Sequence, residues 1–95
     1  MSLYRRGRSK EYQAIELLER LGYKVIRSAA SHGPIDIIAG TRDGDRRAIA
    51  VKYGKKPYIP PEERKHLKEW AEAFAAKAEV WFFKKGEAKP KIEYV

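Results

Sequence analysis

The stretch over residues 35–53, IDIIAGTRDGDRRAIAVKY, joins two apolar segments through a short polar turn. Asp43 and Gly44 form an Asp-Gly pair, which is typical of a tight β-hairpin turn. The apolar segments on either side, 35–39 and 47–53, have the length and composition of buried strands. The stretch therefore predicts two antiparallel strands at the centre of a sheet.

Each of these two predicted strands carries one charged residue. Side chains alternate between the faces of a strand, so Asp36 shares a face with Ile38, and Lys52 shares a face with Ala50. A charge inside an apolar strand costs free energy unless it is paired. Two interpretations remain open at this point. Asp36 and Lys52 form a plain ion pair at the sheet edge, or they belong to a site that acts on phosphodiesters.

The segments around this hairpin predict one α/β domain with helices on a mixed sheet. Residues 1–8, MSLYRRGR, lack periodicity and are interpreted as a basic arm of the single domain over 1–95. Ser9 is a suitable cap for the first helix, and Pro61 suits the first turn of the second. The expected elements are a helix over 9–21, strands over 24–28, 35–39 and 47–53, a helix over 61–77, a strand over 79–84 and a short strand over 90–95.

Both predicted helices have an apolar stripe. Glu11 lies on the stripe of the first helix, where an inward carboxylate requires a partner or a metal. Alternatively it lies at the edge of the core and only favours the helix dipole. The stripe of the second helix includes Trp70 and Phe74, and helical spacing predicts that both pack in the core.

The charge of the chain favours a polyanion as partner. Twenty-one Lys and Arg residues stand against thirteen Asp and Glu, for a formal net charge of +8. Such an excess in a short chain points to nucleic acid, and no predicted helix has the basic and apolar faces of a membrane-surface helix. The sequence has no cysteine, no long apolar run and no signal-peptide pattern, so we expect a soluble cytoplasmic protein.

Two short motifs resemble the signature of the PD-(D/E)xK nuclease fold, an aspartate followed on the next strand by an acid-x-lysine. PID at 34–36 matches its first half, and AVK at 50–52 matches its second half except for the acid. A longer resemblance, to the archaeal Holliday-junction resolvases, covers residues 4–59. It rests on YRRGRSKEYQAIELLERLGYKVIRSAASHGPIDIIAG at 4–40 and on AIAVKYGKK at 48–56.

This resemblance implies a restriction-endonuclease-like core with the element order αβββαβ(β), and a homodimer that nicks four-way DNA junctions in recombination and repair. The implied cofactor is Mg²⁺, with Mn²⁺ as an alternative. Glu11 and Asp36 are the implied metal ligands and catalytic acids, and Lys52 is the implied catalytic lysine. Ser31 is an implied catalytic serine on a loop near the cleaved strand. The candidate DNA contacts are Arg5, Arg6, Lys10, His32, Lys55 and Lys56.

Ala50 departs from the family pattern, because resolvases of this type have an acid there. Its loss removes a direct oxygen ligand, so we expect weak metal binding and impaired or absent cleavage with DNA binding kept. Three explanations are open: an engineered change, a natural non-cutting relative, or an acid that has migrated to Glu63 in the second helix. For Glu63, a plain first-turn glutamate that favours the helix dipole is the alternative. A protein-interaction module on the same fold also remains possible.

Overall fold

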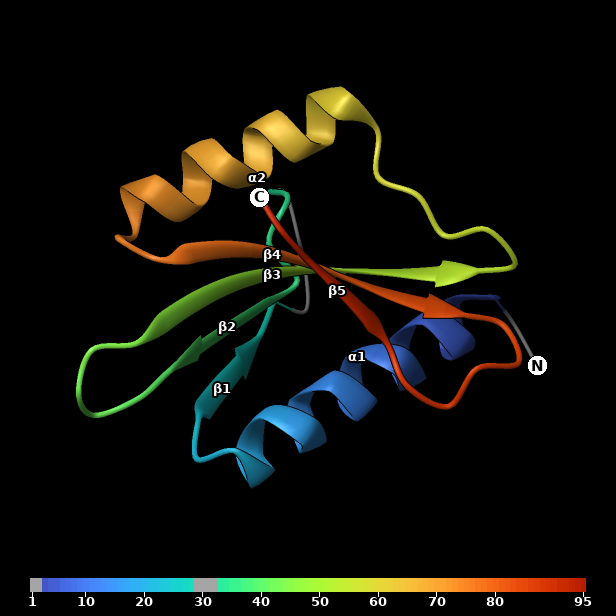
Figure 1. Ribbon diagram of the computed structural model, residues 1–95, viewed down its shortest axis with the longest axis horizontal. Helices are drawn as coiled ribbons and strands as arrows, with labels where there is room; N and C mark the ends of the chain where they lie inside the picture. Colours follow the sequence, from blue (N-terminus) through green and yellow to red (C-terminus); the bar gives the residue numbers. More distant parts are fainter. Residues whose placement is uncertain (1–2, 29–32) are drawn as a thin grey trace.

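The computed structural model describes residues 3–28 and 33–95, with side chains described from Ser9 onward. Figure 1 shows two helices and a five-stranded sheet in the expected chain order. None of the described helices has the length and apolar composition of a membrane span. The elements are α1 (Leu3–Arg20), β1 (Lys24–Arg27), β2 (Ile37–Gly40), β3 (Arg46–Gly54), α2 (Pro61–Ala73), β4 (Lys77–Lys84) and β5 (Lys91–Tyr94).

The sheet is mixed, with the spatial order β1-β2-β3-β4-β5. Its neighbours are antiparallel except β3 and β4, which are parallel and are connected through α2. The β2–β3 hairpin turns at the predicted place, since Gly44 has a φ of 94° and Thr41 N–H donates to Asp45 O at 2.9 Å. The α/β class and the mixed sheet are therefore confirmed.

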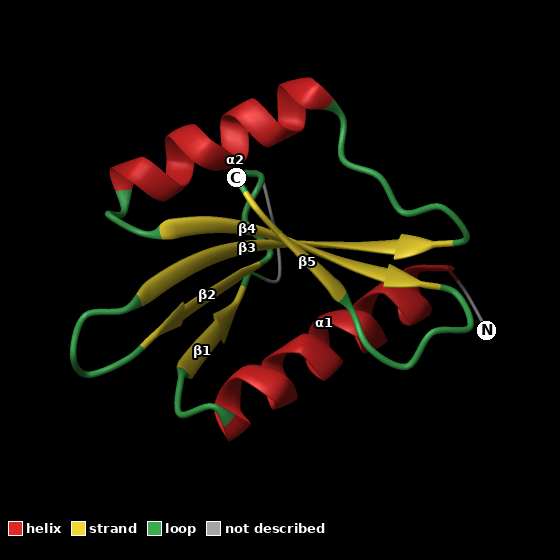
Figure 2. Cartoon of the chain, in the orientation of Figure 1, coloured by secondary structure: helices red, strands yellow, loops and turns green. Residues whose placement is uncertain are grey.

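The two helices cover opposite faces of the sheet (Figures 1 and 2). On the α1 face, Leu18 packs in one apolar cluster with Ile49 and Phe83. On the α2 face, Leu67 packs in a second cluster with Ala50 and other small strand residues. Successive residues of the central strands pack alternately in the two clusters. The sequences of these strands are therefore nearly continuous apolar runs.

The first helix begins earlier than predicted. It starts at Leu3 rather than at Ser9, so residues 3–8 form its first turns. The glycine at position 7 costs about 1 kcal/mol in a helix interior, and the surrounding residues are good enough helix formers to continue through it. The predicted start at Ser9 was wrong because a capping residue is permitted inside a helix as well as before one.

The second helix ends earlier than predicted, at Ala73 instead of near Lys77. Ala75 takes a left-handed conformation with a φ of 53°, and Ala76 N–H donates to Ala71 O at 2.8 Å. This is the geometry of a helix end that usually has glycine. Because an alanine occupies that position, the sequence has no local signal for the stop.

Trp70 and Phe74 are not core residues, contrary to the prediction. Their side chains are 43% and 52% exposed, whereas Leu67 and Ala71 on the same helix are buried. The two aromatic side chains extend past the covered part of the sheet, toward the short edge strand β1. They line an apolar groove together with Ile26, Ile35 and Ile38, which we call the β1-side groove.

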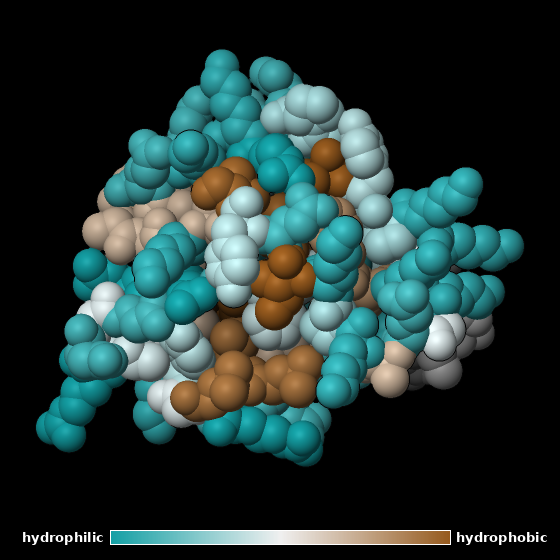
Figure 3. All heavy atoms as spheres, viewed as in Figure 1, coloured by the Kyte–Doolittle hydropathy of each residue, from teal (hydrophilic) through white to brown (hydrophobic). Residues whose placement is uncertain are grey.

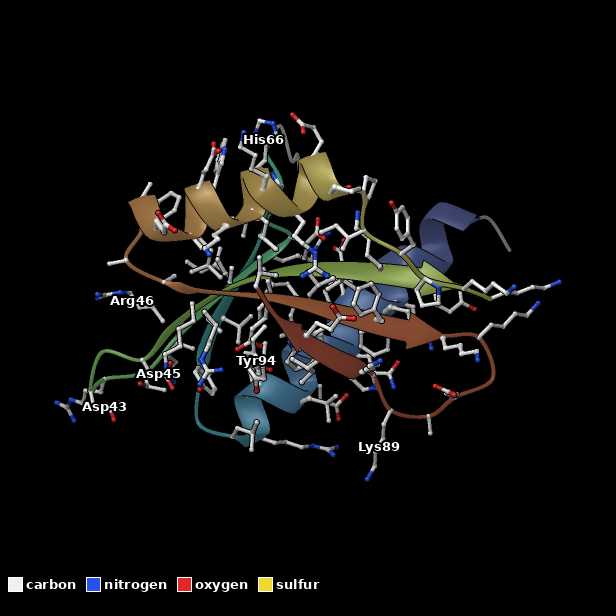
Figure 4. All side chains as sticks on the ribbon, turned by 45° about the horizontal axis from the view of Figure 1, so that its top comes forward. Asp43, Asp45, Arg46, His66, Lys89 and Tyr94 are labelled. Carbon is white, nitrogen blue, oxygen red and sulfur yellow. The ribbon has the colours of Figure 1, made fainter. Side chains whose placement is uncertain are left out.

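A polar network holds the end of the sheet where β3 begins, the end at which Figure 4 shows Asp45. Arg47 Nε donates to Asp45 Oδ1 at 2.8 Å, and Arg47 also pairs with Glu79, which is buried. Trp81 Nε1 donates to Glu79 at 2.9 Å, and Tyr23 donates to Asp45 at 2.7 Å. The hydrogen bonds from Arg47 and Tyr23 lower the pKa of Asp45 to about 2. The buried charge is therefore satisfied within the protein, and this network is a structural feature.

Candidate active site

Asp36 lies in the bend just before β2, one residue earlier than the strand itself. Its N–H donates to Ile49 O at 2.9 Å, and its carboxylate Oδ2 accepts from Val51 N–H at 2.8 Å. These two bonds, to Ile49 and Val51, flank Ala50, so Asp36 lies beside Ala50. The predicted neighbourhood of Asp36 and position 50 is thus present, although the predicted strand start at Ile35 was wrong.

The charges around Asp36 show which side chains converge on it. Burial raises the pKa of the Asp36 carboxyl, and the hydrogen bond from Val51 N–H lowers it. Among neighbouring charges, Glu11 raises that pKa, Lys52 lowers it, and Glu63 raises it. One helix on each face and the central strand therefore each bring an ionisable group into the electrostatic field of Asp36.

The basic groups of this cluster pair with glutamates. Lys52 forms an ion pair with Glu63 at the start of α2, and Arg27 Nη1 donates to Glu11 Oε1 at 3.0 Å. A plain Asp36–Lys52 ion pair, one of the two interpretations of the strand charges, is absent among the described residues. Arg27 is the partner that an inward Glu11 required, and sequence reasoning missed it.

The carboxylates as arranged here do not make a magnesium site. Ala50 is fully buried in the α2-face cluster and supplies no oxygen. Glu11 and Glu63 each contact a cationic side chain. Within the described residues, no three acidic or histidine side chains come together in a way that could hold a metal ion. Mg²⁺ prefers several oxygen ligands in near-octahedral geometry, and this cluster does not supply them.

The predicted DNA contacts fall into three groups. Lys55 and Lys56 are exposed directly after β3, near Lys52. Lys10 lies on the α1 face of the sheet, with its Nζ 5.3 Å from the ring centroid of Tyr53. The other candidates are not placed: Ser31 and His32 lie outside the described residues, and for Arg5 and Arg6 only the helical backbone is described.

Gly33 lies directly against Trp70 of the second helix. A Cβ added at Gly33 would lie 2.6 Å from the indole of Trp70, so a larger residue would displace one of the two. Sequence reasoning missed this contact, because the glycine was interpreted only as a break in the chain.

Comparisons with known proteins place this geometry in a family. The model of the family described as archaeal Holliday junction resolvase (Hjc) matches residues 2–92. The chain belongs to the archaeal Holliday junction resolvase family. This confirms the resemblance seen in the resolvase-type motifs, and the family match runs from α1 into β5.

Two relatives of this resolvase-family chain are informative. The crossover junction endodeoxyribonuclease Hjc of Methanocaldococcus jannaschii is 41% identical over 76 residues, which are 78% of this chain and 56% of that protein. The chain therefore matches little more than half the length of that curated relative. The structure of Archaeoglobus fulgidus Hjc, a Holliday junction resolvase from an archaeal hyperthermophile, has a TM-score of 0.81 and 27% identity. That match covers 94% of this chain and 72% of the other.

The raised pKa of Asp36 predicts that this residue costs stability. Above its folded pKa the ionised carboxylate is less favourable in the folded chain than in the unfolded one, and the cost disappears as the pH falls toward the unfolded value of 3.8. Asp36→Asn should therefore raise the free energy of unfolding near neutral pH, with the gain shrinking in acid. Urea unfolding across this pH range measures the difference.

The control for this measurement is Glu69→Gln, which changes an exposed carboxylate on α2. It should leave stability unchanged at each pH. A loss of stability in Asp36→Asn near neutral pH that fades in acid would contradict the raised pKa, because it is the signature of a carboxylate stabilised by ion pairing.

Proposed function

We propose that this chain is a resolvase-type protein that binds branched or duplex DNA and cleaves it weakly or not at all. The observation that carries the proposal is Ala50, which is fully buried beside Asp36 at the position where the family pattern has an acid. The remaining glutamates of the cluster are engaged by Arg27 and Lys52. Both glutamates of the cluster are thus paired with a cation, and Asp36 is held by Val51 N–H.

DNA binding is supported by charge and by position. The chain has a net charge of +8, and Lys55 and Lys56 are exposed just past Lys52 on the same strand. Phosphate contacts by Lys and Arg supply most of the affinity of non-specific DNA binding. Lys52, partly exposed beside Glu63, is positioned to add a further phosphate contact once its ion pair opens.

A second candidate, an active endonuclease with a migrated acid, is favoured by one contact. Glu63 reaches Lys52 from α2, and its charge acts on Asp36. In this alternative Glu63 replaces the acid missing at position 50, and a divalent cation, Mg²⁺ or Mn²⁺, would activate water and offset charge on the scissile phosphate. The ion pair of Glu63 with Lys52 argues equally for a purely structural role of Glu63. Experiment separates this structural role from a role as the migrated acid.

A homodimer is also proposed, with the β1-side groove as the contact between two copies. Ile26, at the edge of the sheet, is 71% exposed, and Trp70 and Phe74 stand beside it. Contiguous exposed apolar side chains of this size are typical of interaction surfaces. A two-fold axis through this groove would place the same side chains on both partners.

The first prediction of this function concerns salt. Alanine at four predicted phosphate contacts should flatten the slope of log affinity against log salt by about 0.9 per contact that is lost. Fluorescence anisotropy with a labelled four-way junction measures the slope. The four positions are Arg5, Arg6, Lys55 and Lys56.

The control removes the same number of charges elsewhere and should leave the slope close to that of the unaltered chain. A slope that is equal in the two variants would show that only net charge matters, and would contradict the assigned contacts. The control positions, all exposed, are Lys24, Lys65, Lys68 and Lys77.

The second prediction restores the missing ligand. Ala50→Glu places a carboxylate beside Asp36 and two residues before Lys52. Without metal, the buried charge should lower the free energy of unfolding by about 3–5 kcal/mol. Mn²⁺ or Mg²⁺ should recover part of this loss in thermal unfolding and produce nicking of four-way junctions.

Ala48→Glu is the matched control, because Ala48 is equally buried on the same strand face but lies away from Asp36. It should lose stability without any recovery by metal. Cleavage by Ala50→Glu but not by the unaltered chain identifies a disarmed site. Comparable cleavage by the unaltered chain would overturn the main proposal in favour of Glu63, and Glu63→Gln should then abolish it.

The third prediction concerns assembly. Replacing both Trp70 and Phe74 with glutamate should convert the dimer to a monomer, because two charges would be buried at the contact. Sedimentation equilibrium reports the mass, with Tyr94→Glu as a control on another exposed aromatic residue. A variant that stays dimeric, or an unaltered chain that is monomeric at micromolar concentration, would exclude this groove as the dimer contact.

A further inference from the structure

A second groove lies at the end of the sheet where β3 and β4 finish. Its volume is about 350 Å³, and its lining includes Lys55 and Lys56 from the β3–α2 connection and Lys84 and Lys91 from β4 and β5. Figure 3 shows hydrophilic side chains projecting at this end of the molecule. We call this feature the lysine groove. Its β4–β5 side, with Lys84 and Lys91, is not among the DNA contacts named so far.

The lysine groove is continuous with the face of the sheet that presents Lys52. In the sheet register Lys52 pairs with Phe82, and Phe82 pairs with Lys91. Directly paired residues share a face, so all three point to the α2 side. Phe82 also lines the groove, which therefore begins next to Lys52 and continues across β4 to β5.

The charge of the groove is not neutralised from within. None of its four lysines forms an ion pair with any described residue, whereas Lys52, Arg27 and Arg47 all do. Two acids, Glu87 and Glu93, also line the groove, and Arg64 holds Glu93 at 2.7 Å. The lysines outnumber the available acids, and their ammonium groups are free to contact an anion.

Hydrogen bonds hold the two sides of the groove together. Lys85 N–H donates to Gly54 O at 2.8 Å, which ties the β4–β5 turn to the end of β3. Within the turn, Glu87 N–H donates to Lys84 O at 3.0 Å, and Gly86 has a φ of 88° that glycine adopts without strain. Gln13 of α1 donates to Ala88 O at 3.4 Å. A basic surface held in this way loses little conformational freedom on binding.

We propose that the lysine groove binds the sugar-phosphate backbone of duplex DNA. The bound backbone lies next to the DNA strand that faces Lys52. The proposal rests on the DNA binding proposed above and extends it to Lys84 and Lys91. A phosphate backbone is the occupant that fits, because it presents a row of negative charges that can follow lysines from the β3–α2 connection to β5. Figure 4 shows Lys89 projecting from the same turn, away from the sheet.

The test compares two double variants of equal charge. Lys84→Gln/Lys91→Gln alters the groove, and Lys24→Gln/Lys77→Gln alters exposed lysines that begin strands at the opposite end of the sheet. Anisotropy titrations over a range of salt use a labelled duplex and a labelled four-way junction. The groove variant should reduce the salt slope by about two units, at 0.9 per contact, and the control should match the unaltered chain.

Lys55→Gln/Lys56→Gln, measured in parallel, separates this proposal from the function on which it rests. If that variant loses affinity while the Lys84 and Lys91 variant behaves like the control, DNA binding stands and its extension across the groove is overturned. If the unaltered chain binds neither DNA at low salt, the proposed function itself is overturned. A reduced slope in both groove variants, with an unchanged control, supports the extended contact.

Discussion

The burial of β3 on both faces constrains the rest of the structure. α1 covers one face of this strand and α2 covers the other, so Ala48, Ile49 and Ala50 are all fully buried. A strand in this position tolerates charge only where it leaves the two layers, and Lys52 is at that point. Asp36 is held beside the strand by Val51 N–H. The candidate site is therefore located by packing before any chemistry is considered.

The same constraint gives Ala50 a physical meaning. The cluster around Asp36 has three carboxylates, on Asp36, Glu11 and Glu63, and its basic partners are Arg27 and Lys52. Burial already raises the pKa of Asp36. A further buried acid at position 50 would require a cation to offset it, whereas alanine fills the space and adds to the apolar cluster. Alanine at this position therefore provides packing that needs no metal.

Some of this arrangement could be predicted from the sequence, because it follows from local rules. Strand alternation and the Asp-Gly turn were enough to place Asp36 near position 50. The Lys52–Glu63 pair depends on where α2 crosses β3, which no local pattern reports. The exposure of Trp70 was missed for a related reason, since helical spacing defines a stripe but does not say how far the sheet extends beneath it.

The two grooves lie at opposite edges of the sheet, which bears on how they would work together. β1 and β5 are the two edge strands, so the β1-side groove and the β5 part of the lysine groove are separated by the width of the sheet. Two copies joined through the β1-side groove would leave both lysine grooves open. A two-fold axis at that contact would present two equivalent basic surfaces, each next to its own Lys52.

A DNA junction has paired arms that such a symmetric surface can contact simultaneously, and each copy then increases the effective concentration of DNA at the other. Strong binding of branched DNA in this arrangement requires no cleavage at all, so losing the acid at position 50 is compatible with keeping the fold, the basic surface and the dimer contact.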